Sequence, residues 1–385
     1  MSKQIILKLV LSLMLVSILA TACAPAPSTS TGLPAEITIA AVEDLTGRNE
    51  IYGKPIQMGI DLAVKQINEQ KYLGEGVTLK VTYTDTASET DPAVEAFKKL
   101  VADPNITAII GPTISTQALA ADPLAQEAGV PVVATSNTAK GITEIGNYIF
   151  RTSLPETAVI PNTVRVTAEG FNLQKVAIIY GTDDAFTTSA EAIFKDALTQ
   201  ANIEILTEET FALGDTDFTA QLTKIKDLNP DAIIVAALSE EASRIMVQAR
   251  EMGIPTNVPF IGGNSFNSIL VPQAAGAAGE GAISGSAWSL ASTIPASVAF
   301  VEAFRAEYGV DPDQFAAQSY TAAWVIALAI KSANSVDHAA VRDALAGTKN
   351  FDSPLGQFSF DANRDPLHEP VVLVVKDGKF DVYQP

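Results

Sequence analysis

Cysteine and histidine are nearly absent from this chain of 385 residues, which contains one cysteine and two histidines. One cysteine cannot form an intramolecular disulfide, and so few soft ligands leave no zinc site. Neither a G-x-S-x-G elbow nor a complete phosphate-binding loop occurs, and no D-x-D-x-D-G calcium loop is present. The sequence therefore predicts no catalysis, no metal and no cofactor.

Positive charge is also scarce, with 25 Lys and Arg against 44 Asp and Glu and a formal net charge of −19. Such a surface repels phosphate backbones, so nucleic acid is not expected as a partner. Beyond the N-terminus no apolar run approaches membrane length without polar interruption, the best candidate being 322–330. The remaining chain, about 350 residues, is long enough for two domains.

The N-terminus predicts export. Lys3 and Lys8 precede the apolar run LVLSLMLVSILA at 9–20, which is shorter than the about 20 residues that a membrane helix needs. Small residues then lead into Cys23, and the segment resembles a bacterial lipoprotein signal. The resemblance implies a signal peptide at 1–22, a lipid on Cys23 and a flexible tether at 23–35. An ordinary signal with an unrelated cysteine remains the alternative.

Strand-like and helical patterns alternate through the rest of the chain. The first half predicts, in order, a strand at 37–45, helical spacing over 56–67, strands at 77–83 and 106–111, a helix at 115–128 and a strand at 131–136. Residues 218–264 repeat the order of 97–138. This βαβ series predicts an α/β fold of two halves, each with a parallel sheet covered by helices on both faces.

In open α/β sheets, ligands bind beyond the carboxyl ends of the strands. The loops expected there are 112–116 and 136–138 in the first half, and 238–241 and 263–265 in the second. Two halves facing each other across such loops make a cleft. The short segments 151–155, 283–286 and 353–356 are expected to cross between the halves, and such crossings suit a hinge.

Six segments carry a resemblance to a known family: 45–68, 109–138, 175–186, 248–254, 316–330 and 353–366. In their order and spacing the chain resembles a periplasmic binding protein of the Leu/Ile/Val-binding type, the substrate-binding component of branched-chain amino-acid ABC transporters. The resemblance implies two Rossmann-like lobes joined by three hinge strands, the first lobe comprising 36–154 and 284–354 and the second 155–283 and 355–385.

The same resemblance implies a monomer that captures a small amino-acid-like, carboxylate or amide solute by closure of its lobes. Permease and ATPase subunits would be its partners. The expected location is the outer face of the cell membrane or the periplasm. The ligand-binding subunit of an extracellular sensor is an alternative from the same fold, and a lipid-anchored hydrolase is a remote one.

Four hydroxyl residues are the first ligand-binding candidates. Ser115 and Thr116 open a helix directly after a strand, where free amides and hydroxyls favour a carboxylate. The resemblance implies that Ser115 holds the ligand carboxylate and that Ser136 and Thr138 add hydrogen bonds. The alternatives are helix caps for the first pair and turn residues for the second.

Aromatic candidates are Tyr52 and Phe186, which match positions that line the pocket in the family. Trp288 is a further candidate, with core packing as its alternative.

The charge of the ligand depends on position 264. Relatives that bind amino acids have an acid where this chain has Asn264, and usually a tyrosine where it has Leu238. An asparagine cannot neutralise an ammonium, so Asp184, Asp183 or Glu240 would have to substitute. The alternative is a ligand without an amine, such as an aromatic or aliphatic acid or an amide.

Overall fold

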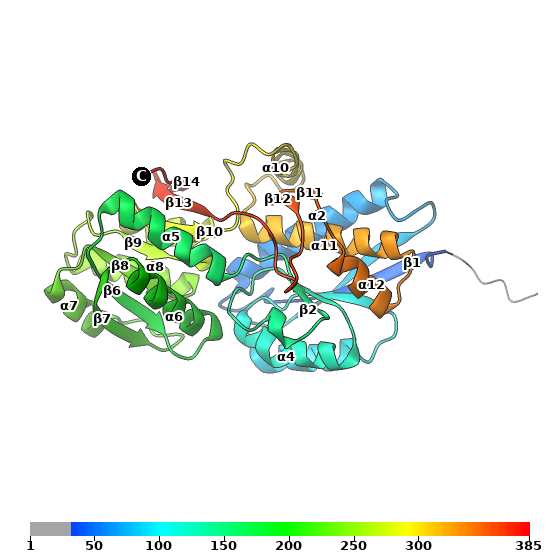
Figure 1. The fold of residues 1–385 in the computed structure, drawn as a ribbon, viewed down its shortest axis with the longest axis horizontal. Helices are drawn as coiled ribbons and strands as arrows, with labels where there is room; N and C mark the ends of the chain where they lie inside the picture. Colours follow the sequence, from blue (N-terminus) through cyan, green and yellow to red (C-terminus); the bar gives the residue numbers. More distant parts are fainter. Residues whose placement is uncertain (1–31) are drawn as a thin grey trace, which may run out of the picture. The chain divides into compact units, whose positions relative to one another are not determined.

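The structure is a computed structural model that describes residues 32–385. The expected signal peptide at 1–22, Cys23 and most of the expected tether lie outside these residues. The protein has an α/β fold with two lobes, each built around its own sheet (Figure 1), as predicted.

The first lobe is built on a parallel sheet with the strand order β2-β1-β3-β4-β5. All five residues of β3 are buried, as expected of a strand covered by helices on both faces. The elements of this lobe are β1 (Glu36–Glu43), α2 (Glu50–Glu69), β2 (Thr78–Asp85), α3 (Thr90–Leu100), β3 (Ile106–Ile110), α4 (Ser115–Ala128), β4 (Val132–Ala134), η1 (Thr143–Ile145), β5 (Ile149–Arg151), α10 (Pro295–Tyr308), α11 (Gln314–Ala333), α12 (His338–Ala346) and the hairpin β11 (Phe351–Ser353) with β12 (Gly356–Phe358).

The second lobe is built on a mixed sheet with the order β14-β13-β10-β9-β8-β6-β7. Strands β10, β9, β8, β6 and β7 are parallel, whereas β13 and β14 are antiparallel additions at one edge. The elements are α5 (Glu156–Phe171), β6 (Lys175–Gly181), α6 (Ala185–Gln200), β7 (Glu204–Phe211), α7 (Thr219–Leu228), β8 (Ala232–Ala236), α8 (Ser239–Glu251), β9 (Phe260–Gly262), η2 (Asn264–Phe266), α9 (Leu270–Ala275), η3 (Gly276–Gly279), β10 (Ile283–Ser286), β13 (Val371–Lys376) and β14 (Lys379–Val382).

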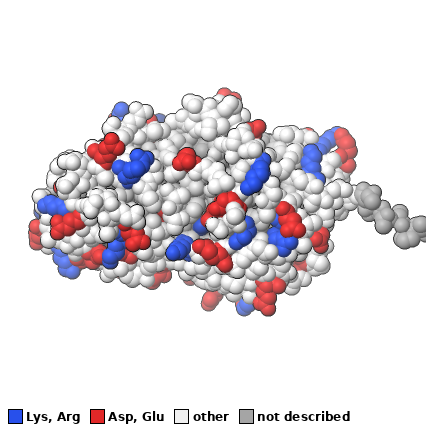
Figure 2. Space-filling model, viewed as in Figure 1, with Lys and Arg blue, Asp and Glu red and all other residues white. Residues whose placement is uncertain are grey.

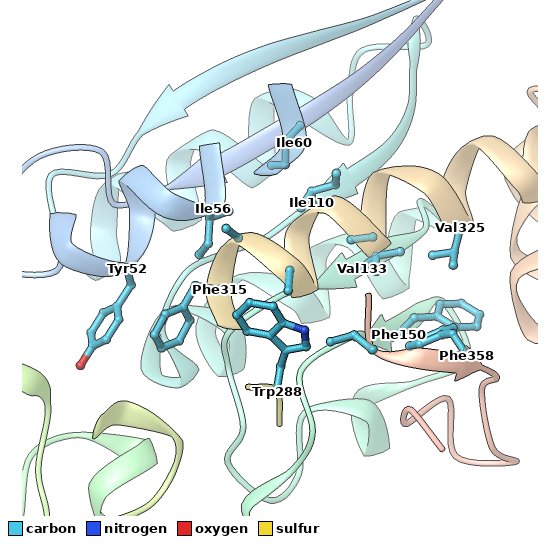
Figure 3. Close-up of a cluster of buried hydrophobic side chains, with 14 of the residues drawn as sticks. Tyr52, Ile56, Ile60, Ile110, Val133, Phe150, Trp288, Phe315, Val325 and Phe358 are labelled. Atoms are coloured by element: carbon cyan, nitrogen blue, oxygen red, sulfur yellow. The ribbon is translucent and has the colours of Figure 1, made fainter. Parts of the chain in front are cut away.

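The apolar helix α11 forms the centre of the first lobe and lies against α2. Gly59 of α2 allows this close approach, because a Cβ there would lie 2.3 Å from the backbone oxygen of Ala316. Figure 3 shows the resulting hydrophobic cluster, with Phe315 of α11 beside Tyr52 and Ile56 of α2. The packing sets the start of α11 close to the start of α2, and both helix starts border the site described below.

The crossings between the lobes differ in detail from the expected boundaries. Strand β10, partly assigned to the first lobe by the expected boundary at 284, pairs with β9 and β13 in the second sheet. Arg364 and Asp365, expected in the second lobe, instead bond to Ile149 O and to Arg151. Pro366 and Leu367 pair in turn with Phe360 and Ser359 of the first lobe. These contacts favour crossings after Ser286 and after Leu367, which we propose in place of 284 and 355.

Acidic and basic side chains are interspersed over the visible face (Figure 2). Within residues 32–385, no helix is both long and apolar enough to cross a membrane. The apolar run at 322–330 is part of α11 and is almost wholly buried. Its hydrophobicity is therefore explained by core packing.

Candidate functional site

A cavity lies where loops of the two lobes meet, and its space of about 340 Å³ includes a part open to solvent. From the first lobe it is bordered by residues that follow β3 and β4 and by the starts of α2 and α11. From the second lobe it is bordered by the starts of α6 and α8 and by η2. The lining residues are Tyr52, Thr113, Ile114, Ser115, Ser136, Thr138, Phe186, Leu238, Asn264, Ser265 and Phe315.

Ser115 begins α4 and is buried, but its hydroxyl does not cap its own helix. The cap position is Ile114, whose side chain cannot accept a hydrogen bond, and the first turn of α4 contains no acidic residue. The Ser115 hydroxyl instead accepts from the backbone amides of Thr138 and Ala139, both at 3.2 Å. The positive end of α4 therefore lies at the cavity without an acid of its own, although the carboxylates of Asp184 and Asp44 bond to Thr116 and Gln117 of its first turn.

Side-chain hydroxyls of the loop after β4 bond this loop to neighbouring segments. Ser136 Oγ donates to Thr113 O at 2.5 Å, and Thr138 Oγ1 donates to Glu156 Oε1 at 3.4 Å. Both side chains line the cavity. Their bonds connect the two first-lobe loops to each other and to the start of α5.

The second lobe contributes an apolar and a polar part of the lining. Leu238 occupies the cap position of α8, and Phe186 lies in the first turn of α6. Asn264 begins η2, and its Nδ2 donates to Leu154 O at 3.0 Å. Phe315 of the first lobe packs edge-on to Tyr52 with ring centroids 4.9 Å apart. A ligand here would contact apolar side chains from both lobes.

Tyr52 connects the lobes directly. Its hydroxyl accepts from Ser239 N at 2.7 Å and lies 2.5 Å from Ser239 Oγ. Since Ser239 Oγ donates to Ser265 O at 2.9 Å, Tyr52 is the donor to Ser239. Figure 3 shows the Tyr52 hydroxyl pointing away from the hydrophobic cluster. Burial raises the pKa of this hydroxyl, so it remains a neutral donor.

Three predicted site residues, Thr116, Asp184 and Trp288, do not line the cavity, and neither do the possible substitutes Asp183 and Glu240. Thr116 donates to Asp184 Oδ2 at 2.6 Å, and Asp184 also caps α6 by accepting from Phe186 N and Thr187 N at 3.0 Å. These two residues join the lobes beside the cavity. Trp288 instead donates through its indole N–H to Ser297 Oγ and packs edge-on to Phe300, which matches the core-packing alternative.

Two buried carboxyl groups lie behind the cavity rather than in it. Burial raises the pKa of Glu156 to about 7, and its Oε1 accepts from Asn264 N at 3.1 Å. Burial also raises the pKa of Glu43 well above its ordinary value, and Thr113 Oγ1 donates to this carboxyl at 2.6 Å. None of the eleven lining residues has a carboxylate or a cationic side chain.

An ion pair crosses between the lobes at the edge of the cleft. Arg48, in the loop before α2, contacts Glu241 of α8, which also accepts from Gly214 N. The Glu241 side chain is only 1% exposed and that of Arg48 is 26% exposed, so the carboxylate of this pair is shielded from water while the guanidinium is partly hydrated. With the Tyr52 and Thr116 bonds, it holds the two lobes together around the cavity.

Four lining residues were not among the predicted ones: Thr113, Ile114, Ser265 and Phe315. The first three lie within the loops 112–116 and 263–265 that were expected at the cleft, but they were not singled out as ligand-binding residues. Phe315 could not be predicted from these loops, because α11 is far from them in the sequence. Among residues 32–385 there is no cluster of three or more His, Cys, Asp or Glu side chains that could hold a metal ion.

Two lobes joined by three crossings, with a small cavity at the facing ends of their parallel strands, define a two-lobed solute-binding protein. The sequence pattern of the family described as "Periplasmic binding protein" matches residues 36–379. The chain therefore belongs to the periplasmic binding protein family, and its function is to bind a solute.

Individual relatives show which members of the family the chain is similar to. The chain is 28% identical to the Leu/Ile/Val-binding protein BraC3 of Rhizobium johnstonii, covering 86% of this chain and 89% of the relative. It is 32% identical to LivJ, a branched-chain amino acid transporter substrate-binding protein of Streptococcus pneumoniae solved with isoleucine, over 91% of this chain and all of that one, with a TM-score of 0.83.

A third similarity is to a solute-binding protein of an ABC transporter from Rhodopseudomonas palustris, solved with 3,4-dihydroxybenzoic acid. It is 26% identical, covers 90% of this chain and 95% of that one, and has a TM-score of 0.80.

Proposed function

We propose that this protein is the extracytoplasmic solute-binding component of an ABC importer and that it captures a small carboxylate or amide solute by closure of its lobes. The observation that carries the proposal is the cavity between the lobes, where the start of α4, which has no acid of its own, borders the same space as Leu238, Phe186 and Asn264. One end of such a site favours an anion, and its walls favour an apolar body.

The relatives support this choice of solute. Isoleucine and 3,4-dihydroxybenzoic acid, the compounds in two of the similar structures, differ in their side groups but share a carboxylate. The shared carboxylate would lie at Ser115 and Thr138, and the differing part would lie against the second lobe. We assign no catalytic step to the site and propose that the receptor acts as a monomer.

Release of the natural solute tests the proposal. The purified full chain is denatured, the released small molecules are identified by mass spectrometry, and the refolded protein is titrated with them by calorimetry. We expect a carboxylate or amide compound that binds with one site per chain. A protein that retains no solute and binds none would contradict the proposal.

The variant Ser115→Ala tests the proposed position of the carboxylate. It removes a hydroxyl beside the proposed carboxylate and the acceptor for two buried amides, so affinity should fall about tenfold or more. The control is Ser335→Ala, because Ser335 lies outside the cleft and accepts only from Asp337 N. Equal affinities of Ser115→Ala and the wild type would show that this residue does not hold the solute.

We further propose that Cys23 carries a lipid that keeps the receptor at the membrane. The support is its position directly after the apolar run and the small residues of the N-terminal segment. In a bacterial host, the full chain should sediment with membranes and incorporate labelled fatty acid, and Cys23→Ala should abolish both. Membrane association that persists in Cys23→Ala would exclude this anchor.

A further inference from the structure

Asn264 presents a hydrogen-bond acceptor of fixed orientation at the cavity. Its Nδ2 donates to Leu154 O, and its Oδ1 is buried without a hydrogen-bond partner in the described part of the chain. Exchanging the two ends of the amide would place Oδ1 against the Leu154 carbonyl, acceptor against acceptor. The residue is only 3% exposed and lines the cavity, so a solute bound there is placed to supply the donor that Oδ1 lacks.

A neutral donor suits this position, because no carboxylate lines the cavity. Glu156 already accepts from Asn264 N and from Thr138, and it does not line the cavity. Asp184 is engaged by amides of α6 and by Thr116. Glu156 Oε2 has no partner in the described part of the chain, but burial raises the pKa of this carboxyl to about 7, so it is only partly ionised near an ammonium at Asn264. A hydroxyl at Asn264 needs no opposite charge and does not carry the cost of a poorly paired ammonium.

The end of the cavity at α4 favours an anion rather than a neutral donor. The start of α4 has no acid in its first turn, and Ile114 offers no acceptor. The carboxylates of Asp184 and Asp44 bond to the side chains of Thr116 and Gln117 in this turn and do not line the cavity, so an anion in the cavity still meets the positive helix end. The solute thus needs an anionic group at α4 and a neutral donor at Asn264.

Resting on the proposed function above, we propose that the solute is a hydroxycarboxylic acid, with its carboxylate at the start of α4 and its hydroxyl donating to Asn264 Oδ1, and that an α-amino acid is discriminated against. Its apolar part lies against Leu238, Phe186 and Phe315.

The test uses two sets of compounds that differ in one group. The first set is 2-hydroxy-4-methylpentanoate, leucine and 4-methylpentanoate, and the second is mandelate, phenylglycine and phenylacetate. The refolded full chain, free of solute, is titrated with each at pH 7 by calorimetry. In at least one set, the hydroxy acid should bind about tenfold or more tighter than the amino acid, and about three- to tenfold tighter than the unsubstituted acid.

Variants at position 264 test whether the Asn264 side chain causes the preference for a hydroxy acid. Asn264→Leu should make the hydroxy and unsubstituted acids bind equally, because the acceptor is gone. Asn162→Leu is the matched control, since Asn162 lies on α5 and is bonded only by Arg165. The double variant Asn264→Asp with Glu156→Gln should shift preference toward the amino acid, because it puts one carboxylate at the cavity without a second beside it.

Circular dichroism establishes that each variant is folded, and the wild-type comparison is decisive even where a variant does not fold. The proposal is overturned if the amino acid binds as tightly as the hydroxy acid, or if the hydroxyl preference survives in Asn264→Leu. It is also overturned if neither set binds while the solute released from the protein does, and in that case the proposed function stands. If no small molecule binds at all, both fail.

Discussion

Single polar side chains determine the shape of the cleft loops, because each bonds to the backbone of a neighbouring segment. Ser115 receives two amides of the loop after β4, and Asn264 donates to the carbonyl of Leu154 in the first crossing. Glu156 receives the amide of Asn264. These bonds satisfy buried backbone groups that would otherwise be costly, so the residues are structural whatever else they bind.

Glu156 makes folding stability depend on pH. Burial raises the pKa of its carboxyl from 4.5 to about 7 in the folded chain, so the folded state keeps a proton that the unfolded state releases. Its contribution to stability is fully present below pH 4.5 and is lost as pH rises to about 7, by up to about 3 kcal/mol. The group faces the charge of Arg151, which itself pairs with Asp365.

Glu156→Gln should remove this loss while keeping an acceptor for Asn264 N. We expect its free energy of unfolding in urea to exceed that of the wild type by up to about 3 kcal/mol at pH 8 and by less than about 1 kcal/mol at pH 5. Glu169→Gln, an exposed change on the same helix, should behave as the wild type at both values. The same pH dependence in Glu156→Gln and the wild type would contradict the assignment.

At the scale of elements, five helices, α2, α4, α6, α8 and α11, begin at the cleft, but only α4 begins without an acid in its first turn or at its cap. Asp184 caps α6, and Glu240 and Glu241 lie in the first turn of α8, whereas the first turn of α4 has neither a capping side chain nor an acid. Negative charge near a helix start neutralises its positive end. The anion preference of the cleft is therefore concentrated at α4.

Ile114→Asp tests this difference in charge. An aspartate at the cap should stabilise α4 by about 0.5–2 kcal/mol, yet it should weaken binding of a carboxylate solute about tenfold or more by placing a like charge beside it. Ile114→Asn supplies a cap without the charge and should retain most of the affinity. Thermal unfolding and calorimetry give the two readouts. Equal affinities of the two variants would argue against an anion at α4.

Many of the helices and strands could be predicted from the sequence. The pattern placed a helix at 115–128 and a strand at 106–111, and the structure has α4 at Ser115–Ala128 and β3 at Ile106–Ile110. Asp377 and Gly378, a residue pair typical of a hairpin turn, both have positive φ between β13 and β14. These features depend on local periodicity and turn chemistry, which are visible in neighbouring residues.

At the scale of the whole molecule, the contact of Arg48 with Glu241 should stabilise the closed arrangement of the lobes. The pair joins a loop of one lobe to a helix of the other, so it breaks when the lobes separate. Water can hydrate Glu241 when the lobes are apart. Loss of Arg48 therefore destabilises the closed form more than the open form.

Arg48→Ala should therefore increase the rate of solute dissociation about tenfold and change the association rate little. Arg244→Ala is the control, because Arg244 pairs with Glu240 within α8 and does not cross the cleft. Stopped-flow fluorescence with the released solute gives both rates, and small-angle scattering should show a larger radius of gyration for the bound variant than for the bound wild type. An unchanged dissociation rate would mean that the pair does not hold the lobes.

The sequence by itself determined the α/β class, the duplicated order of elements and the cleft loops, because helix and strand periods and strand-ending hydroxyls are local properties of the chain. It also led to Ser115, Ser136 and Thr138, which follow their strands directly. Only the tertiary structure decided that Phe315 borders the cavity, that Trp288 packs in the core and that Asp184 caps α6 while receiving Thr116 from the other lobe. Those outcomes depend on contacts between residues far apart in the chain, which no local pattern encodes.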